Sequence, residues 1–341
     1  MKKRYIFTCL IYFCIIFVSC DFSEKSNTQK AEDGLTIQGT PAIAEISQKI
    51  ENEPNNPDLY VMRGQLFYEE GQYLATVSDL TQAIDLDSTN FAYHHLLADA
   101  YFDSNQSKPA LAILEKVIKK DSTRINTLLK LAEMQMILRQ HEASLLNVNK
   151  ILQQKSRHPE GFYLAGLNFE QTGDTARAII SFQTTVEEDP DHLDAYLKLG
   201  GHFDKQDKPI ALKYYDNALR IDSTDVSALM GKAWYFHQRN KFTQAKKHYE
   251  KAAAFHPFDS RIHFNNGILH LEIKDAETAY KKFDLAVQVD KQLGKGYYYR
   301  AYAGERIGKD KADIINDYQQ AVAFMPDPTA ARKALQRLEK Q

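Results

Sequence analysis

The chain has 341 residues, of which 43% are hydrophobic and 26% charged, so it carries enough apolar material for a large folded core. Glycine and proline number only 15 and 10, which favours long helices joined by short loops over many short strands. The formal net charge is −2 and no basic run exceeds three residues, so nucleic acid is not an expected partner. All three cysteines precede residue 21, which excludes disulfides, cysteine metal sites and thiol nucleophiles from the body.

The N-terminus has the layout of an export signal. Three basic residues at positions 2–4 precede an almost unbroken apolar run from Tyr5 to Val18, and a small residue, Ser19, stands before Cys20. The chain then turns polar at once. This order predicts a signal peptide over residues 1–19. The run is shorter than the roughly 20 residues that a membrane-spanning helix needs.

The sequence Val18-Ser19-Cys20 resembles the cleavage box of bacterial lipoproteins, although Phe17 stands where that family usually has leucine. The resemblance implies cleavage before Cys20, which then carries acyl chains such as palmitate. An ordinary signal peptide with a chance cysteine is the alternative. We therefore expect an exported protein, lipid-anchored to a bacterial envelope membrane and most simply the outer one, with its body in the periplasm or at the cell surface. The membrane leaflet stays open.

The segment after Cys20 is rich in Ser, Thr, Lys, Glu, Asp and Gln and poor in apolar residues up to Thr40. Such a composition predicts a flexible tether over residues 20–40. A coil of about 20 residues spans roughly 25 Å, which would lift the body clear of lipid headgroups.

The remainder is built from a repeat of 34 residues, with one interval of 33. A small residue recurs at Gly64, Ala98, Ala132, Gly166, Gly200, Ala233, Gly267 and Ala301. A large residue follows each one after 15 to 17 positions, at Leu80, Leu114, Val148, Phe182, Tyr215, Tyr249, Phe283 and Tyr318. In the fourth unit Phe162, Gly166 and Phe169 share one helix face, and Gly173 ends that helix. Each unit therefore predicts a helical hairpin that must stack on its neighbours to bury its apolar face.

These registers resemble the tetratricopeptide repeat family. The best matches are Phe162, Ala165-Gly166, Phe169, Ala178, Phe182 and Pro190, and then Tyr196, Leu199-Gly200, Phe203, Ala211, Tyr215 and Ala218. The resemblance implies an all-α fold, a right-handed α-solenoid of about eight hairpins over residues 57–328. A leading half-repeat helix is expected at 41–56 and a capping helix at 329–341. The third repeat departs most from the pattern, with Gln135 at an aromatic position and Ser144 in place of alanine.

In this family the first helix of each repeat lines a concave face through its fifth and ninth positions. Here the early repeats place polar or acidic residues there, such as Gln65, Asp99 and Glu133, and the later repeats place apolar and aromatic ones. Exposed apolar patches commonly mark binding sites. The hypothesis is a groove for an apolar or amphipathic protein segment, lined by Tyr163, Leu167, Met230, Trp234, Phe264, Ile268, Tyr298 and Tyr302. The alternative is that packing between neighbouring repeats buries these side chains.

No enzyme motif is apparent. The chain lacks Gly-x-Ser-x-Gly, His-Glu-x-x-His and a phosphate-binding loop. His263 and His270 share a helix face about 10 Å apart, too far to chelate one ion, so we expect them to serve packing. We expect no catalytic residue, no metal and no cofactor.

Four tripeptides, Asp87-Ser88-Thr89, Asp121-Ser122-Thr123, Asp174-Thr175-Ala176 and Asp222-Ser223-Thr224, resemble an O-glycosylation acceptor motif of exported bacterial proteins. All fall at predicted turns between helices, where Asp and Ser satisfy free backbone groups. The turn interpretation is the simpler one.

Together these features predict a membrane-anchored scaffold or adaptor of the cell envelope that binds a partner protein in its groove. Two other functions remain open. One is an envelope enzyme with a dispersed His and carboxylate site, and the other is a homo-oligomeric structural spacer whose aromatic surface pairs with itself.

Overall fold

The computed structural model describes residues 29–30, 36–37 and 39–340 of the chain. The predicted signal peptide, Cys20 and most of the predicted tether lie outside these residues. Within the tether segment the structure places two short antiparallel strands that the composition did not predict, β1 (Gln29–Lys30) and β2 (Thr36–Ile37). From Pro41 onward the described chain consists of helices and the turns that join them.

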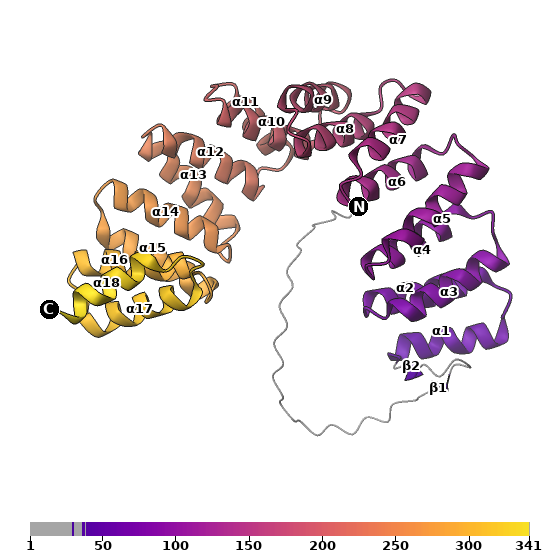
Figure 1. The fold of residues 1–341 in the computed structure, drawn as a ribbon, viewed down its shortest axis with the longest axis horizontal. Coiled ribbons are helices and arrows are strands. Elements are labelled where there is room, and N and C mark those ends of the chain that lie inside the picture. The colour runs from indigo at the N-terminus through magenta and orange to yellow at the C-terminus, as the bar shows by residue number, and fades with distance from the viewer. Residues whose placement is uncertain (1–28, 31–35, 38, 341) are drawn as a thin grey trace. The chain divides into compact units, whose positions relative to one another are not determined.

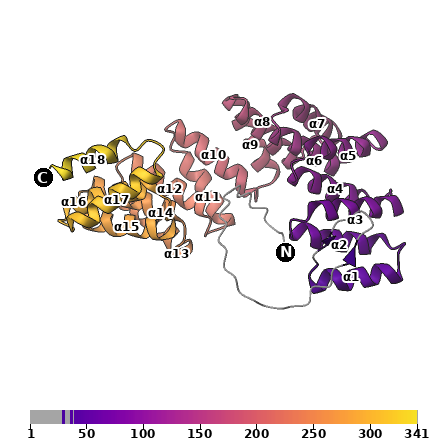
Figure 2. The same cartoon turned by 60° about the horizontal axis from the view of Figure 1, so that its bottom comes forward.

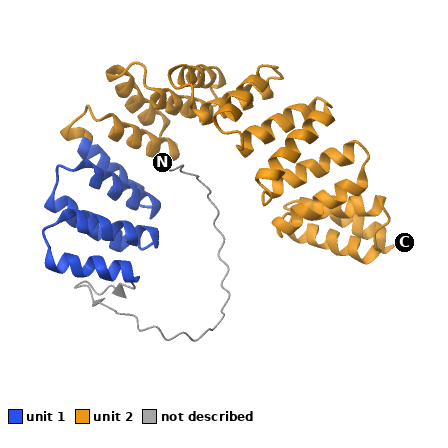
Figure 3. Ribbon diagram, turned by 180° about the vertical axis from the view of Figure 1, so that it is seen from behind, with its two compact units in different colours: residues 1–117 blue, residues 118–341 orange. Residues whose placement is uncertain are grey.

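The helices belong to two compact units, residues 1–117 and 118–341 (Figure 3). The first unit holds α1 (Pro41–Asn52), α2 (Pro57–Glu69), α3 (Tyr73–Leu86), α4 (Phe91–Asp103) and most of α5 (Ser107–Lys120). The second unit holds α6 (Ile125–Ile137), α7 (His141–Gln154), α8 (Pro159–Gln171), α9 (Thr175–Glu188), α10 (Leu193–Lys205), α11 (Ala211–Ile221), α12 (Val226–Gln238), α13 (Phe242–Phe255), α14 (Ser260–Glu272), α15 (Ala276–Val289), α16 (Gly294–Arg306), α17 (Lys311–Phe324) and α18 (Thr329–Glu339).

The helices pair in chain order into eight hairpins, from α2 with α3 to α16 with α17, and α18 follows the last hairpin (Figure 1). Within the second unit every helix packs against the next one along the chain, as α14 to α17 illustrate (Figure 2). The predicted all-α repeat fold is confirmed, while the hand of the superhelix stays a prediction. None of the helices that the structure describes is long and apolar enough to span a membrane.

The two residue series found in the sequence meet inside each hairpin. A Cβ atom built on Gly166 would lie 2.5 Å from Cε1 of Phe182, and one built on Gly267 would lie 2.6 Å from Cε1 of Phe283. Both phenylalanines are fully buried. The small residue thus lets the ring of the second helix pack directly against the backbone of the first helix. Interiors packed this closely have no space for an added methyl group.

Every hairpin reverses direction through one residue in the left-handed backbone region. These residues are Gly71, Asn105, Arg139, Gly173, Asp207, Asn240, Lys274 and Gly308, with φ between 54° and 84°. The amide after each turn residue bonds back into the preceding helix, as Asp174 N does to the carbonyl of Phe169 at 2.8 Å. This arrangement is the Schellman ending that favours glycine or asparagine.

The third repeat replaces apolar packing with buried hydrogen bonds, which explains its poor match to the family pattern. Ser144 Oγ donates to the carbonyl of Ala132 at 2.7 Å, and Asn147 Nδ2 donates to Gln135 Oε1 at 2.9 Å. Asn168 of the next repeat donates to Ser144 Oγ at 2.9 Å. Because its partners are in place, the polar set is compatible with burial.

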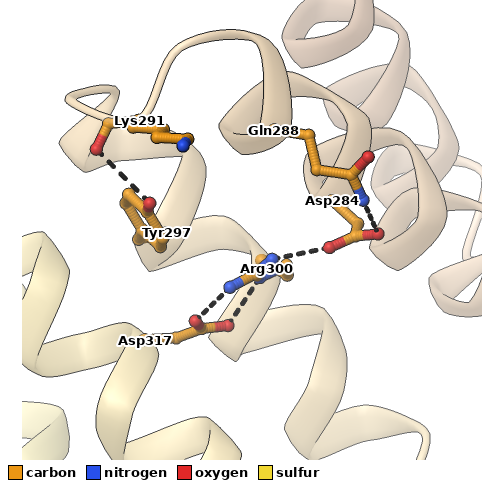
Figure 4. Close-up of polar contacts among 6 residues, drawn as sticks. All are labelled: Asp284, Gln288, Lys291, Tyr297, Arg300 and Asp317. Carbon is orange, nitrogen blue, oxygen red and sulfur yellow. Dashed lines mark hydrogen bonds and ion pairs between the residues drawn. The ribbon is translucent and has the colours of Figure 1, made fainter. Parts of the chain in front are cut away.

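Arginine–aspartate clusters tie helices together at both ends of the array. Arg300 Nε donates to Asp317 of α17 at 2.8 Å and its Nη1 donates to Asp284 of α15 at 2.6 Å (Figure 4). In the first repeat Arg63 holds Asp79 through Nε at 2.8 Å. Both arginines occupy the seventh position of a first helix, where Leu97 stands in the second repeat.

Candidate protein-binding face

The eight predicted groove residues all lie on first helices of hairpins in the second unit. Helix α8 carries Tyr163 and Leu167, α12 carries Met230 and Trp234, α14 carries Phe264 and Ile268, and α16 carries Tyr298 and Tyr302. Trp234 is 42% exposed, and the other seven are half-buried. The structure brings Tyr298 and Tyr302 into a stacked pair with ring centroids 6.4 Å apart. Trp234 is therefore the most accessible member of the set.

Packing explains much of the burial of the other groove residues. The Tyr163 ring lies 5.7 Å from the ring of Phe182. The Phe264 ring lies 5.7 Å from that of Phe283. The remaining contacts are of the same kind: Leu167 packs on the Phe182 cluster, Met230 on the Tyr249 cluster, Ile268 on the Phe283 cluster and Tyr298 on the Tyr318 cluster. These side chains contribute to the core of the array whether or not they also bind a partner.

Tyr302 differs from the other groove residues because a cationic side chain of the same protein covers its ring. The guanidinium carbon of Arg306, one helical turn further along α16, lies 3.4 Å from the Tyr302 ring centroid. Such cation–π contacts contribute about 0.5–1 kcal/mol at exposed sites. One face of Tyr302 is thus already occupied.

Trp234 begins a chain of contacts that links two repeats. Its ring centroid lies 5.7 Å from that of His237, and Nε2 of His237 lies 3.0 Å from Oε2 of Glu272 on α14. Because a carboxylate accepts only, Nε2 donates to it, and Nδ1 of the neutral imidazole then accepts from the hydroxyl of Tyr249 at 3.3 Å. His237 is 4% exposed, whereas the Glu272 side chain is 48% exposed. The buried imidazole therefore positions an accessible carboxylate near an accessible indole.

Space is open in the repeat before Trp234. A Cβ atom built on Gly201, at the same repeat position of α10, would meet no atom within 4 Å. Helices α10 and α12 contact each other directly. They approach closely because Tyr215 packs against both Gly200 and Gly231, whose added Cβ atoms would lie 2.6 Å and 2.5 Å from its ring. The open position at Gly201 and the indole of Trp234 therefore lie on two helices that pack closely together.

Other carboxylates on these first helices are held by basic side chains from the next repeat. Glu170 lies 3.1 Å from Nε2 of His202 and 2.5 Å from Nζ of Lys198. The contact with His202, together with Lys198, lowers the pKa of Glu170 to about 2. Asp204 accepts from Arg239 at 3.0 Å. These ion pairs join neighbouring hairpins.

Sequence reasoning did not identify His237 and Glu272 as neighbours of Trp234. It considered only the fifth and ninth positions of each first helix, whereas these residues hold the twelfth position of α12 and the thirteenth of α14. The spacing of three residues between Trp234 and His237 is a sequence signal for a shared helix face. The contact with Glu272 depends on how repeats stack, which spacing alone does not reveal.

The histidines expected to serve packing are buried. His263 and His270 are 6% and 2% exposed. His263 Nε2 lies 2.8 Å from the carbonyl oxygen of Pro257, and His270 Nδ1 lies 3.1 Å from Asp275. Among the residues that the structure describes, no group of three or more His, Cys, Asp or Glu side chains is placed to hold a metal ion.

The Asp-Ser-Thr tripeptides close turns between repeats. Asp87 Oδ1 accepts from the amide of Thr89 at 2.9 Å and from its hydroxyl at 2.7 Å. The same two bonds recur between Asp121 and Thr123 and between Asp222 and Thr224. The structure therefore supports the turn interpretation for these three tripeptides, and glycosylation at them stays untested.

Comparison with characterised proteins gives partial matches. The chain is 24% identical over 152 residues to anaphase-promoting complex subunit 3 of Schizosaccharomyces pombe, covering 44% of this chain and 23% of that protein. It is 24% identical over 135 residues to the type IV pilus assembly protein PilF of Pseudomonas aeruginosa, covering 39% and 54%. The chain thus matches about a quarter and about half of the lengths of these relatives.

A solved structure supports the fold. The C-terminal part of a tetratricopeptide repeat protein from Cytophaga hutchinsonii superposes with a TM-score of 0.56 at 18% identity, over 70% of this chain and 98% of that one. Two models of the tetratricopeptide repeat match the sequence, one over residues 67–132 and the other over 163–226, 201–259 and 230–292. Together they cover more than half of the chain, which belongs to the tetratricopeptide repeat family.

Proposed function

We propose that the protein is a lipid-anchored scaffold of the bacterial cell envelope that binds a segment of a partner protein along the first helices of its later repeats. Tetratricopeptide repeats typically act as non-catalytic scaffolds for protein–protein interactions. The observation that carries the proposal is Trp234, a 42% exposed aromatic on a first helix. Tryptophan is among the residue types that dominate binding energy at interfaces.

Site-specific crosslinking tests where the partner binds. A photoreactive phenylalanine analogue replaces Trp234 in the full-length, processed protein, and in a matched control it replaces Ile180 of α9, which is 61% exposed on a second helix. We expect a discrete crosslinked protein from position 234 and none from position 180. Equal crosslinking from both positions would remove the support for a binding face on the first helices.

Truncation of the indole tests its contribution to affinity. Trp234→Ala is expected to weaken binding of the crosslinked partner by about 2 kcal/mol, or roughly thirtyfold, because buried interface tryptophans contribute on this scale. Helix content and thermal stability should change little, since the side chain is exposed. A folded variant with unchanged partner affinity would refute the groove.

The anchor is tested separately. Cys20→Ala removes the only residue to which the lipoprotein resemblance assigns acyl chains. The wild-type protein is expected to incorporate labelled palmitate and to sediment with membranes after a high-salt wash, and the variant to do neither. Retention of the variant on washed membranes would assign the attachment to something other than lipid on this cysteine.

A further inference from the structure

We propose that Trp234 and Glu272 form a recognition site for a cationic side chain, an arginine or lysine, of the bound protein segment. This inference rests on the proposed function, because it assigns the chemistry of the partner that the first helices bind.

The geometry joins an aromatic face to a carboxylate. His237 connects the two, with its ring 5.7 Å from the indole and its Nε2 3.0 Å from Glu272. Trp234 is 42% exposed and the Glu272 side chain 48% exposed, so both are accessible to an incoming group. A cation over an indole is attracted by the ring's negative face, and tryptophan is the best aromatic for this contact. The neighbouring carboxylate adds an ion pair and a hydrogen-bond acceptor.

The charge on Glu272 remains available, unlike that of carboxylates near the ends of α8 and α10. Glu170 pairs with Lys198 and Asp204 pairs with Arg239. Glu272 instead contacts an imidazole, and in the described part of the chain it has no lysine or arginine within ion-pair distance. A cation supplied by another molecule would complete at Glu272 the pairing that Lys198 and Arg239 provide elsewhere.

Two first helices, α12 and α16, already have arginine side chains over aromatic rings. The guanidinium carbon of Arg306 lies 3.4 Å from the Tyr302 ring centroid, and that of Arg239 lies 3.6 Å from the Tyr235 centroid. Trp234 and Tyr302 share the ninth position of their repeats. The open space at Gly201 leaves room beside this position in the preceding repeat.

The test uses the only tryptophan of the chain as its reporter. The probes are a short Gly-Ser peptide with one central arginine and the same peptide with citrulline, which keeps the shape and removes the charge. Trp234 fluorescence is excited selectively in the full-length protein while each peptide is titrated to millimolar concentration. We expect the arginine peptide to bind about tenfold more tightly, equivalent to about 1.4 kcal/mol, and added salt to reduce this preference.

Matched variants identify the groups involved. Glu272→Gln should abolish the preference for arginine, whereas Glu277→Gln, which neutralises a 73% exposed carboxylate on α15, should keep it. Gly201→Arg should lower peptide binding by placing the chain's own cation near the site, and Gly201→Ala should not.

Equal binding of the two peptides, a full preference in Glu272→Gln, or no fluorescence response to the arginine peptide would each overturn the inference. Crosslinking at position 234 is read independently of these titrations. If the partner still crosslinks there, the proposed function stands while the cation site falls.

Discussion

Three glycines of the second unit, Gly166, Gly173 and Gly201, have different physical roles. Gly166 is required because Phe182 fills the space of a side chain. Gly173 has a φ of +84° with nothing within 4 Å of an added Cβ, so only its backbone conformation favours glycine. Gly201 has neither constraint, and a helix interior disfavours glycine there.

Alanine at these three positions should therefore give three outcomes. Gly166→Ala should lower the unfolding free energy by about 1–3 kcal/mol through overpacking. Gly173→Ala should lower it by about 1–2 kcal/mol because a Cβ strains the left-handed conformation. Gly201→Ala should raise it by up to about 1 kcal/mol. Urea denaturation followed by circular dichroism measures all three, and loss of stability in Gly201→Ala would contradict the open position assigned to it.

At this scale the sequence predicted the pairing of small with large residues, because a repeat displays it eight times. It could not predict that Trp234, His237 and Glu272 adjoin. Their contact crosses from α12 to α14 and depends on the rotation between successive hairpins, which residue periodicity does not encode. The prediction that the eight groove residues bind a partner stays a prediction, with Trp234 its most accessible member.

Among the helices, α13 and α14 carry a concentration of buried polar atoms without hydrogen-bond partners. In the described residues these atoms include Nδ1 of His248, Nδ1 of His263, Nε2 of His270 and both side-chain polar atoms of Asn266. Each such group costs about 1–3 kcal/mol relative to a satisfied one. This helix pair should therefore open more readily than its neighbours.

Acid should weaken α13 and α14. Burial, aided by Lys232 and Lys247, lowers the pKa of His248 from 6.5 to about 4, and burial also lowers the pKa of His270. As pH falls from about 6.5 toward 4, the unfolded chain takes up protons that the folded histidines do not. Stability should decline by at most about 1.4 kcal/mol per pH unit for each group.

Hydrogen exchange at several pH values measures this effect. Amides of α13 and α14 should lose protection over that range and those of α16 and α17 should not, since α16 and α17 contain no histidine. His248→Gln should flatten the response. An acid response of equal size in α16 and α17 would contradict the assignment to these histidines.

The Arg300 cluster gives a prediction for the last hairpin. Asp317 is 4% exposed, so Arg300→Met would leave a buried charge unpaired and should destabilise α15 to α17 by about 3–5 kcal/mol. The double variant Arg300→Met, Asp317→Leu should recover most of this loss. Urea unfolding and amide exchange in these helices report the change, with Lys295→Ala on the exposed face of α16 as the control. If Arg300→Met left the unfolding free energy unchanged, the Arg300–Asp317 ion pair would make no net contribution to stability.

For the whole molecule, the class of fold was predictable because short-range repetition defines a hairpin and a hairpin must stack. The polar core of the third repeat was not predictable. Its buried hydrogen bonds replace the apolar residues by which a repeat is recognised in the sequence. Helix α18 covers apolar residues of the last hairpin, because Ala331 and Leu338 pack in one cluster with Ile314 and Tyr318 of α17. Its role as a capping helix stays a prediction.

Deletion of residues 329–341 should expose that cluster. We expect the last hairpin to lose amide protection, earlier hairpins of the second unit to keep theirs, and the protein to self-associate through the uncovered apolar surface. Hydrogen exchange and sedimentation velocity measure these effects. Uniform loss of protection throughout the second unit would show that its repeats unfold as one block.

The eight left-handed turn residues also indicate where a repeat protein of this kind can gain or lose repeats. Each reversal depends on one backbone conformation at the same place, so a cassette cut from Gly173 to Asp207 ends in two equivalent joints. Recombination at these turns would insert or delete one pair of helices. The backbone conformation at each junction would stay the same. Evolution, or a protein engineer, has in these turns a natural set of places at which to lengthen or shorten the array.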